Sequence, residues 1–401
     1  DWSSDVCSSD LSKEWLSEII WAGCSRAWGW KGVVVLAALL IATSLWLLHR
    51  CLLATGTETL TATSIVLLTA FAATTHWLAR PHLVTHLLVV AYLWLLTARR
   101  WVWLPVLMLV WANLHGAFFT GFILIAIFMV GAALESRWAD VKGLAVVFGV
   151  SVLASLVNPN GWQLHAQIVG FLRTPELAGM VSEFRSPNFH AGGTRGLLLE
   201  FLAVGLVLLI VRPKLKPTEI LLLGVWGYFA LHSVRNIPVF GFVAAPIFGR
   251  CVRLPVRWEE RGAGGSVTAA VVVGAALVWG NMETEILRSR APVAAVEFLK
   301  SHPNEVPGQM FNDYGWGGYL MWALPERKVF IDGRNDFYGK ELVAEFNRVD
   351  ELKPGWEDVL RKYGVGWTIL PVQHRVNAIL ALDAGWKAVY TDEVAVVYAR
   401  R

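Results

Sequence analysis

Long apolar runs, interrupted by short polar segments, fill most of the chain up to residue 282. A helix that crosses a bilayer needs about 20 mainly apolar residues, with a range of roughly 17–25. The pattern predicts an α-helical polytopic bundle of about ten spans over residues 32–282, several of them short. The ten predicted spans are Gly32–His49, Leu60–Leu78, Leu83–Thr97, Trp101–Asn113, Gly116–Leu134, Gly143–Val157, Gly196–Val211, Thr218–Ser233, Ile237–Gly249 and Ser266–Gly280.

A short amphipathic helix is predicted before the first span, within residues 12–31. Leu16, Ile19 and Ile20 share one helical face, which is typical of a helix lying in the membrane interface. Residues 1–11 resemble a translated sequencing adapter, so we expect them to be an artefact. We expect the natural chain to begin earlier and to contain at least one more membrane helix, so that the bundle is N-terminally truncated.

From Ala291 onward, the apolar pattern changes to that of short strands alternating with helices, which is typical of a small α/β layer domain. We therefore expect a soluble α/β outer domain over residues 283–401. The predicted strands are Gln309–Asn312, Lys328–Ile331 and Gly366–Leu370, the predicted helices are Val293–His302, Gly339–Val349, Trp356–Tyr363 and His374–Leu382, and Trp386–Ala399 is a predicted hairpin.

Composition supports this division. Of the 401 residues, 55% are hydrophobic and only 16% are charged, whereas soluble domains average about 25% charged residues. Residues 1–282 contain 34 Asp, Glu, Lys and Arg, and the remaining 119 residues contain 32. These proportions argue against a wholly soluble enzyme. The net charge of +4 does not favour a nucleic-acid partner.

The basic residues orient the predicted bundle. With ten spans, one set of loops holds 12 Lys and Arg residues, and the other set holds five although it is longer. The positive-inside rule makes the first set cytoplasmic. The C-terminal domain and the segment before Gly32 are then expected on the extracytoplasmic side.

Polar clusters gather on the predicted outer side. Six histidines lie on or near it, but none is paired with a carboxylate at a spacing typical of a metal site, and the four cysteines have no metal-like spacing either. We therefore expect no metal and no cofactor. The six histidines are His76, His82, His115, His165, His190 and His232.

Glu14 is the first candidate catalytic residue. A carboxylate on an interfacial helix could act as a general base toward an acceptor hydroxyl. Glu183, in the long predicted loop from Asn158 to Arg195, is the second, because long loops are often functional. The alternative is that both carboxylates simply face solvent.

Arginines at helix junctions are candidate phosphate ligands. Arg80 precedes Pro81, and Arg235 lies just before the Ile237-Pro238 pair. A guanidinium can bind two phosphate oxygens, so two such arginines on one face would suit a phosphate or pyrophosphate lipid. The alternative is that the arginines only snorkel to the interface.

Further polar residues could shape a pocket on the same side. The alternatives for these are interhelical hydrogen bonding and plain outer turns. The candidate substrate-binding residues of the bundle are Arg80, His82, Asn113, His115, Asn158, Arg185, Arg235 and Asn236.

Two segments of the outer domain follow predicted strands, at the edge where α/β sheets commonly bind ligands. Both combine carboxylates, glycines and aromatic rings, which is a pattern suited to a sugar. The alternative is a pair of tight turns with capping Asp residues. The candidate residues are Asp313, Trp316, Asp332, Arg334, Asp336 and Tyr338.

Taken together, these motifs resemble a family of uncharacterised bacterial polytopic membrane proteins. The resemblance covers nearly the whole chain from Ser12 onward, and that family is in turn distantly similar to GT-C glycosyltransferases such as protein O-mannosyltransferases and lipid A aminoarabinose transferases. The motifs are Glu14-Trp15-Leu16, Arg80-Pro81-His82, Asn113-Leu114-His115-Gly116, Asn158-Pro159-Asn160-Gly161, Arg235-Asn236-Ile237-Pro238 and Asp332-Gly333-Arg334.

The resemblance implies a bacterial inner-membrane enzyme that takes a sugar from a polyprenyl-phosphate donor. The acceptor would be a glycan, a lipid or a protein on the extracytoplasmic face. Glu14 would match the acidic residue of the first outer loop, although the family's paired acidic motif after the first helix is not visible here. The alternative is a non-enzymatic membrane protein, either a lipid-linked sugar transporter or an envelope-assembly scaffold.

Overall fold

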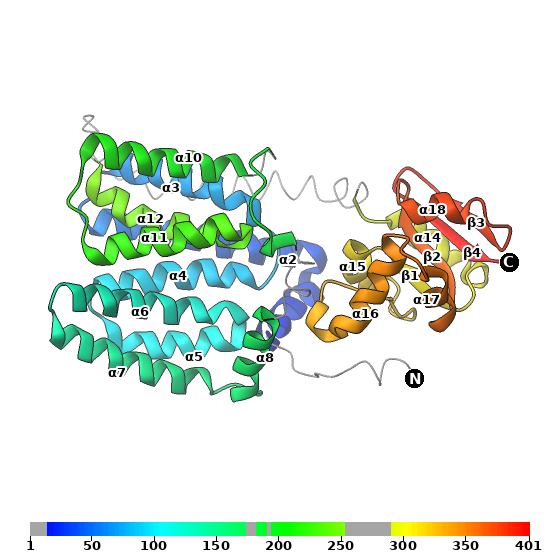
Figure 1. Cartoon of the computed structure of the whole chain (residues 1–401), viewed down its shortest axis with the longest axis horizontal. Helices are drawn as coiled ribbons and strands as arrows, with labels where there is room; N and C mark the ends of the chain where they lie inside the picture. The colour runs from blue at the N-terminus through cyan, green and yellow to red at the C-terminus, as the bar shows by residue number, and fades with distance from the viewer. Residues whose placement is uncertain (1–13, 174–181, 191–193, 253–289) are drawn as a thin grey trace. The chain divides into compact units, whose positions relative to one another are not determined.

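The computed structural model describes residues 14–173, 182–190, 194–252 and 290–401. The described chain divides into two compact units, a helical bundle up to residue 252 and a C-terminal unit from residue 290 (Figure 1). Each unit has its own apolar core.

The bundle consists of apolar helices joined by short 3₁₀ segments. Most helices end where the sequence places proline, glycine or a run of polar residues. The helices are α2 (Trp15–Ala54), α3 (Thr59–Ala73), α4 (His82–Thr97), α5 (Leu104–Leu114), α6 (Phe119–Leu134), α7 (Trp138–Ser155), α8 (Trp162–Leu172), α10 (Arg195–Leu206), α11 (Pro217–His232) and α12 (Ile237–Cys251). The short segments are η1 (Thr74–His76), η2 (Trp101–Trp103), η3 (Gly116–Phe118), η4 (Ser182–Phe184) and η7 (Val234–Asn236), with a π turn, η6 (Val207–Val211), after α10.

Ten membrane spans are not supported. Four helices in the described chain are long and apolar enough to cross a membrane. The other predicted spans that the structure describes are helical but shorter; α4 and α11, for example, have 16 residues each. Sixteen residues extend about 24 Å, which is less than the hydrocarbon core. The four spans are Lys31–Ala54, Thr59–His76, Gly116–Leu134 and Trp138–Ser155, and the predicted span Ser266–Gly280 lies outside the described residues.

Helix α2 contains both the predicted interfacial helix and the first span. Its backbone leaves the helical conformation at Trp28 and Gly29, and Gly29 has a φ of 61°. Such a φ is readily adopted only by glycine. The break separates the segment that begins at Trp15 from the candidate span that begins at Lys31.

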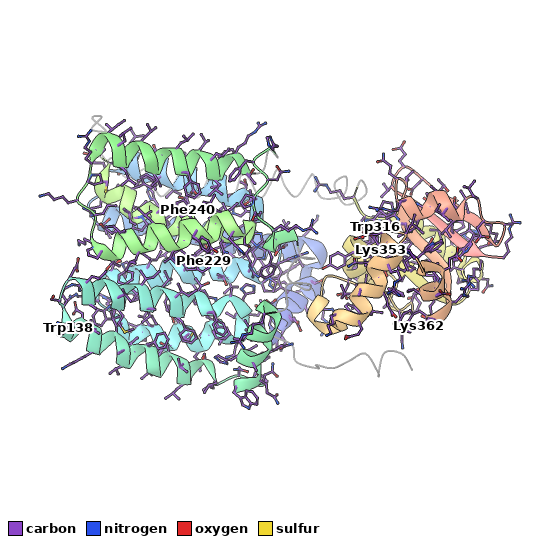
Figure 2. All side chains as sticks on the ribbon, in the orientation of Figure 1. Trp138, Phe229, Phe240, Trp316, Lys353 and Lys362 are labelled. Carbon is purple, nitrogen blue, oxygen red and sulfur yellow. The ribbon has the colours of Figure 1, made fainter. Side chains whose placement is uncertain are left out.

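Helix α12 lies at the centre of the bundle contacts, packed against α3, α4 and α11. Its Phe240 is buried and stacks on Phe201, with 4.8 Å between ring centroids (Figure 2). Gly196 brings α10 close to α3, because a Cβ at this position would overlap the backbone of Ala72. Small residues at helix contacts are the usual way in which membrane helices approach closely.

The C-terminal unit is an α/β domain built on a four-stranded sheet of order β1-β2-β4-β3. β1 and β2 are parallel, whereas β4 is antiparallel to both β2 and β3. The strands are β1 (Gln309–Asn312), β2 (Val365–Pro371), β3 (Trp386–Thr391) and β4 (Ala395–Arg400). The helices are α14 (Val293–Ser301), α15 (Gly317–Ala323), α16 (Asn335–Asp350), α17 (Trp356–Lys362) and α18 (Arg375–Leu380), with η8 (Pro303–Glu305) and η9 (Tyr314–Trp316).

Helices cover both faces of this sheet. Met310 and Ile369 belong to the core that contains residues of α14 and α15, whereas the neighbouring Phe311 and Leu370 belong to the core that contains residues of α16 and α18. This alternation is the period of two expected for a strand buried on both faces.

The predicted strand Lys328–Ile331 is wrong. The segment has no strand conformation, because the side chain of Asn312 takes the place of a neighbouring strand. Its Oδ1 accepts the backbone N–H of Phe330 at 2.7 Å, and its Nδ2 donates to the carbonyl of Ile331 at 2.9 Å. A buried side-chain amide has therefore satisfied the polar groups that would otherwise need a strand partner.

Candidate functional site

Polar side chains gather at one end of the bundle, where α2 and α4 begin and α5 ends. We call this the His115 end. The helices stop there because His115 is in an extended conformation, with φ −157° and ψ 136°, and because Pro81 precedes α4. Ser233 is similarly extended and ends α11 before η7. These breaks bring short non-helical segments from distant parts of the sequence together.

A chain of hydrogen-bonding side chains leads from the interior to Glu14. The indole N–H of Trp111 donates to Thr85 Oγ1 at 2.9 Å, and Thr85 Oγ1 lies 2.7 Å from His115 Nδ1. The backbone N–H of Ala117 also points at Nδ1, at 3.4 Å. Nδ1 therefore accepts, the threonine hydroxyl donates to it, and the ring proton of neutral His115 is on Nε2. Nε2 lies 3.2 Å from Glu14 Oε1.

Within this series of hydrogen-bonded side chains, only Glu14 is accessible to solvent. The side chain of Glu14 is 30% exposed, whereas that of His115 is 7% exposed and Thr85 is buried. Threonine, imidazole and carboxylate in this order resemble a nucleophile triad. However, Thr85 is enclosed and its oxygen already accepts the Trp111 N–H. The group placed to meet a reactant is therefore the carboxylate of Glu14.

The start of α2 is held against the end of α5. Trp15 Nε1 donates to Asn113 Oδ1 at 2.8 Å, and Ser17 Oγ donates to the carbonyl of Leu114 at 2.5 Å. Asn113 Nδ2 donates in turn to the carbonyls of Leu109 and Val157, both at 2.8 Å. Asn113, predicted as a substrate ligand, is thus engaged in positioning the segment that carries Glu14.

A second cluster surrounds Glu183, which the structure brings to the His115 end. Glu183 Oε1 accepts from Arg80 at 2.9 Å, and its Oε2 lies 3.8 Å from His76 Nε2. The guanidinium of Arg235 lies over the Phe184 ring, 4.5 Å from its centroid, and is close enough to Glu183 and Glu14 for charge attraction to both. Arg80 therefore pairs with Glu183, and Arg235 lies near both Glu183 and Glu14.

Three histidines pack beside this cluster. The ring centroids of His76 and His82 are 4.1 Å apart, and those of His82 and His86 are 5.6 Å apart. His82 Nε2 lies 2.7 Å from the His76 carbonyl, so this nitrogen is the donor and carries a proton. In the described part of the chain, no group of three or more His, Cys, Asp or Glu side chains could hold a metal ion.

The remaining candidates in the bundle take part in turns and helix junctions. Asn158 Nδ2 donates to the carbonyl of Ser155, and its Oδ1 accepts the N–H of Asn160. Asn236 Nδ2 donates to the carbonyl of Phe229 at 3.3 Å. The carbonyl of Arg185 accepts the N–H of Val234 at 3.0 Å, which ties the loop to η7. These contacts fit the alternative of structural turns.

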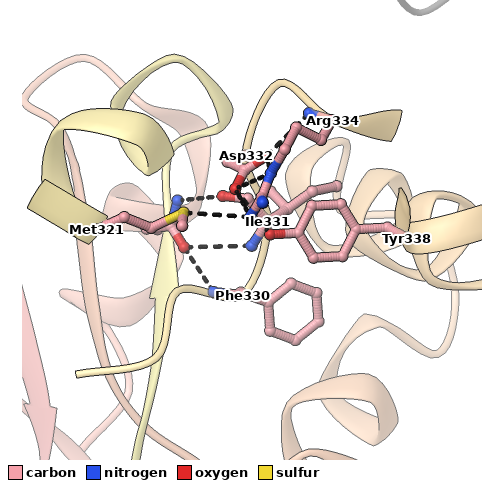
Figure 3. A network of polar contacts seen from close by, with 7 residues as sticks. Met321, Phe330, Ile331, Asp332, Arg334 and Tyr338 are labelled. Atoms are coloured by element: carbon pink, nitrogen blue, oxygen red, sulfur yellow. Dashed lines mark hydrogen bonds and ion pairs between the residues drawn. The ribbon is translucent and has the colours of Figure 1, made fainter. Parts of the chain in front are cut away.

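The candidates in the C-terminal domain form a separate network around Asp332, which is 2% exposed (Figure 3). Asp332 accepts from the guanidinium and the backbone N–H of Arg334 and, at 3.0 Å, from the hydroxyl of Tyr338. Burial and the Asp332 charge raise the pKa of Tyr338. Because the carboxylate oxygens of Asp332 already accept hydrogen bonds from neighbouring residues, Asp332 stabilises the turn after residue 331. The side chain of Asp336 lies outside the described part of the chain.

Asp313 and Trp316 lie at the end of β1. Trp316 Nε1 donates to the carbonyl of Arg290, so the indole N–H is already engaged in a hydrogen bond within the domain. Asp313 Oδ1 accepts the N–H of Gly315 at 2.8 Å. Burial raises the pKa of Asp313, and the nearby His374 partly opposes the increase.

We expect Asp313→Asn to stabilise the C-terminal domain at neutral pH, because the buried site disfavours a charged carboxylate and Asn keeps the oxygen acceptor. A raised pKa in the folded state destabilises that state above this pKa, and the penalty disappears as the pH falls through it. The stability difference between variant and wild type should therefore shrink on acidification. Hydrogen exchange of β2 amides in both proteins would measure it. A difference that stays constant or grows with acidity would contradict the prediction.

Several residues of the site were not predicted from the sequence. Thr85 and Trp111 lie in apolar runs, where nothing distinguishes them from packing residues. His86 follows His82 by four positions, and this helical spacing could have indicated it. Glu200, which no contact among the described residues links to this site, is buried in α10 beside Gly241 of α12, and an ionisable residue within an apolar helix is itself a signal of function.

No known protein-family model matches the chain, and no curated protein is significantly similar to it.

Proposed function

We propose that the protein is a GT-C-like glycosyltransferase of the bacterial inner membrane, which moves a sugar from a polyprenyl-phosphate donor to an acceptor on the extracytoplasmic face. The observation that carries the proposal is Glu14, a half-buried carboxylate at the open end of the buried Trp111–Thr85–His115 chain. It lies near Arg235, and Arg80 pairs with Glu183 in the adjacent cluster, at the end of a bundle of apolar helices.

Glu14 acts as the general base. The acceptor hydroxyl attacks the anomeric carbon of the donor sugar, its proton passes to Glu14, and the bond from the anomeric carbon to the phosphate oxygen breaks. The electron pair of that bond leaves with the lipid phosphate. His115 does not touch the reactants; it donates from Nε2 toward Glu14 and keeps the carboxylate in one orientation.

Arg235 and Arg80 stabilise the leaving phosphate. Negative charge grows on that group as the glycosidic bond breaks, and positioned guanidinium donors favour such a change. Arg235 is held over Phe184, and Arg80 is held by Glu183. We therefore assign Glu183 as a positioning residue for Arg80 and not as the base.

The test is transfer from a defined donor. Membranes that contain the full chain would be given radiolabelled polyprenyl-phosphate sugars, alongside membranes without it. We expect label in a new product only when the chain is present. If no donor gives transfer and labelled lipid moves between the leaflets, the enzyme proposal is rejected in favour of a lipid-linked sugar transporter.

A further inference from the structure

A cavity of about 480 Å³ lies at the opposite end of the bundle from Glu14. The ends of α4, α6 and α12 and the start of α11 surround it. Its inner wall is apolar and includes Leu96, Phe128 and Val243, whereas six charged side chains and three threonines form the rest of the lining. The charged residues are Arg99, Glu135, Arg137, Lys216, Glu219 and Arg250.

The charges of this lining leave an excess of cations. Arg250 is paired with Glu219 through two hydrogen bonds of 2.7 and 2.6 Å. Arg137 is paired with Glu135 at 2.7 Å, and Asp140 accepts from both Arg137 and Arg99. Four cations therefore line the cavity against two carboxylates, and Asp140 nearby reduces the excess to one positive charge. Lys216 is exposed.

The cavity lies at the ends of candidate spans, where the headgroups of a bilayer are expected. Candidate spans end at Ala54 and Leu134, next to the lining residues Thr55 and Glu135. Tryptophan, which favours the membrane interface, is present at this level. Trp101 lines the cavity and lies under the guanidinium of Arg99, and Trp138 at the start of α7 is 61% exposed (Figure 2).

We propose that this cavity binds the headgroup of an anionic phospholipid. The phosphate lies at the cationic rim by Lys216 and Arg99, and the first carbons of the acyl chains lie along the apolar wall. Basic pockets between membrane helices are a known means of selecting anionic headgroups. This site is separate from the His115 end and does not depend on the proposed transfer reaction.

The test measures lipid retention by the purified full chain in detergent. Native mass spectrometry would compare phosphatidylglycerol with phosphatidylethanolamine of the same acyl chains. We expect preferential retention of phosphatidylglycerol. Lys216→Gln should weaken that retention about fivefold, the effect of one basic residue at a membrane surface. Lys214→Gln is the matched control, because Lys214 is an exposed lysine two positions away whose side chain does not line the cavity.

Arg99→Gln is a second test variant. Asp140 keeps its pairing with Arg137 after this substitution, so its carboxylate is not left without a cation. Weaker retention in both lining variants, with Lys214→Gln unchanged, would support the cavity site. If Lys214→Gln weakens phosphatidylglycerol retention equally, the lipid is held by general attraction to the basic surface and the cavity site is overturned. Equal retention of the two lipids by the wild type would overturn it. Displacement of phosphatidylglycerol by an equal concentration of glycerol phosphate would show a site for free phosphate and would overturn a lipid site.

Discussion

Glu14→Gln is expected to lower the rate of glycosyl transfer by about 10²- to 10⁴-fold, the range typical for loss of a general base. The glutamine keeps the size of the side chain and can still accept from His115 Nε2. It cannot take the proton of the acceptor hydroxyl. The loss should appear in kcat, with little change in the KM for the lipid donor, because the carboxylate is not assigned to the lipid phosphate.

Glu18→Gln is the matched control for this prediction. Glu18 lies one helical turn further along α2 and is exposed, and the substitution removes the same charge. It should leave the rate of transfer within about twofold of wild type, as expected of a surface change away from the site. Arg235→Gln should lower kcat and also raise the KM for the donor, because this guanidinium both binds the lipid phosphate and stabilises the charge that grows on it. Transfer that survives in Glu14→Gln would remove Glu14 as the base while leaving the enzyme in place.

Gly317→Ala is expected to destabilise the C-terminal domain by about 1–3 kcal/mol, as overpacking against a fixed backbone does. The backbone of Gly317 is helical, with φ −52° and ψ −47°, so alanine is conformationally acceptable there. The added Cβ, however, would overlap the carbonyl oxygen of Ile331 and lie 2.7 Å from the Cα of Asp332. That segment is fixed by Asn312 and cannot move away without losing buried hydrogen bonds.

The next residue supplies the control for this substitution. A Cβ at Gly318 would meet no atom within 4 Å, and the residue is also in α15. Gly318→Ala should be neutral or stabilising by up to about 1 kcal/mol, because alanine favours the helix. Thermal unfolding of the full chain and hydrogen exchange of the β1 and β2 amides would compare the stabilities of Gly317→Ala and Gly318→Ala. Equal stabilities of the two variants would contradict the close packing at Gly317.

The sequence predicted helices better than it predicted spans. Apolar runs located most of the bundle helices, since an apolar run is a local property that does not depend on the partner of the helix. Whether a helix is long enough to cross a bilayer depends on where it ends. At Pro81 and near His115 the helices stop early, so that α4 has 16 residues and α5 has 11. The described residues therefore do not support the predicted total of ten spans.

The same division applies to the candidate site. The motif residues were chosen by type, and Glu14, Arg80, His115 and Glu183 do lie in polar contacts at the His115 end. Their partners were not predictable, because Thr85 and Trp111 look like packing residues in an apolar run. Asn312 was unremarkable in the sequence, yet its side chain replaces a strand partner.

The sequence by itself determined that apolar helices make up the first part of this chain and that a charged α/β unit follows, because segment hydropathy and strand periodicity are local. Only the tertiary structure decided that His115 contacts the carboxylate of Glu14, 101 positions earlier, and that Glu183 pairs with Arg80. It also decided that the Asp332 carboxylate accepts hydrogen bonds from nearby residues. Such contacts depend on the distances between helix ends and turns, and those distances are set by packing across the whole unit.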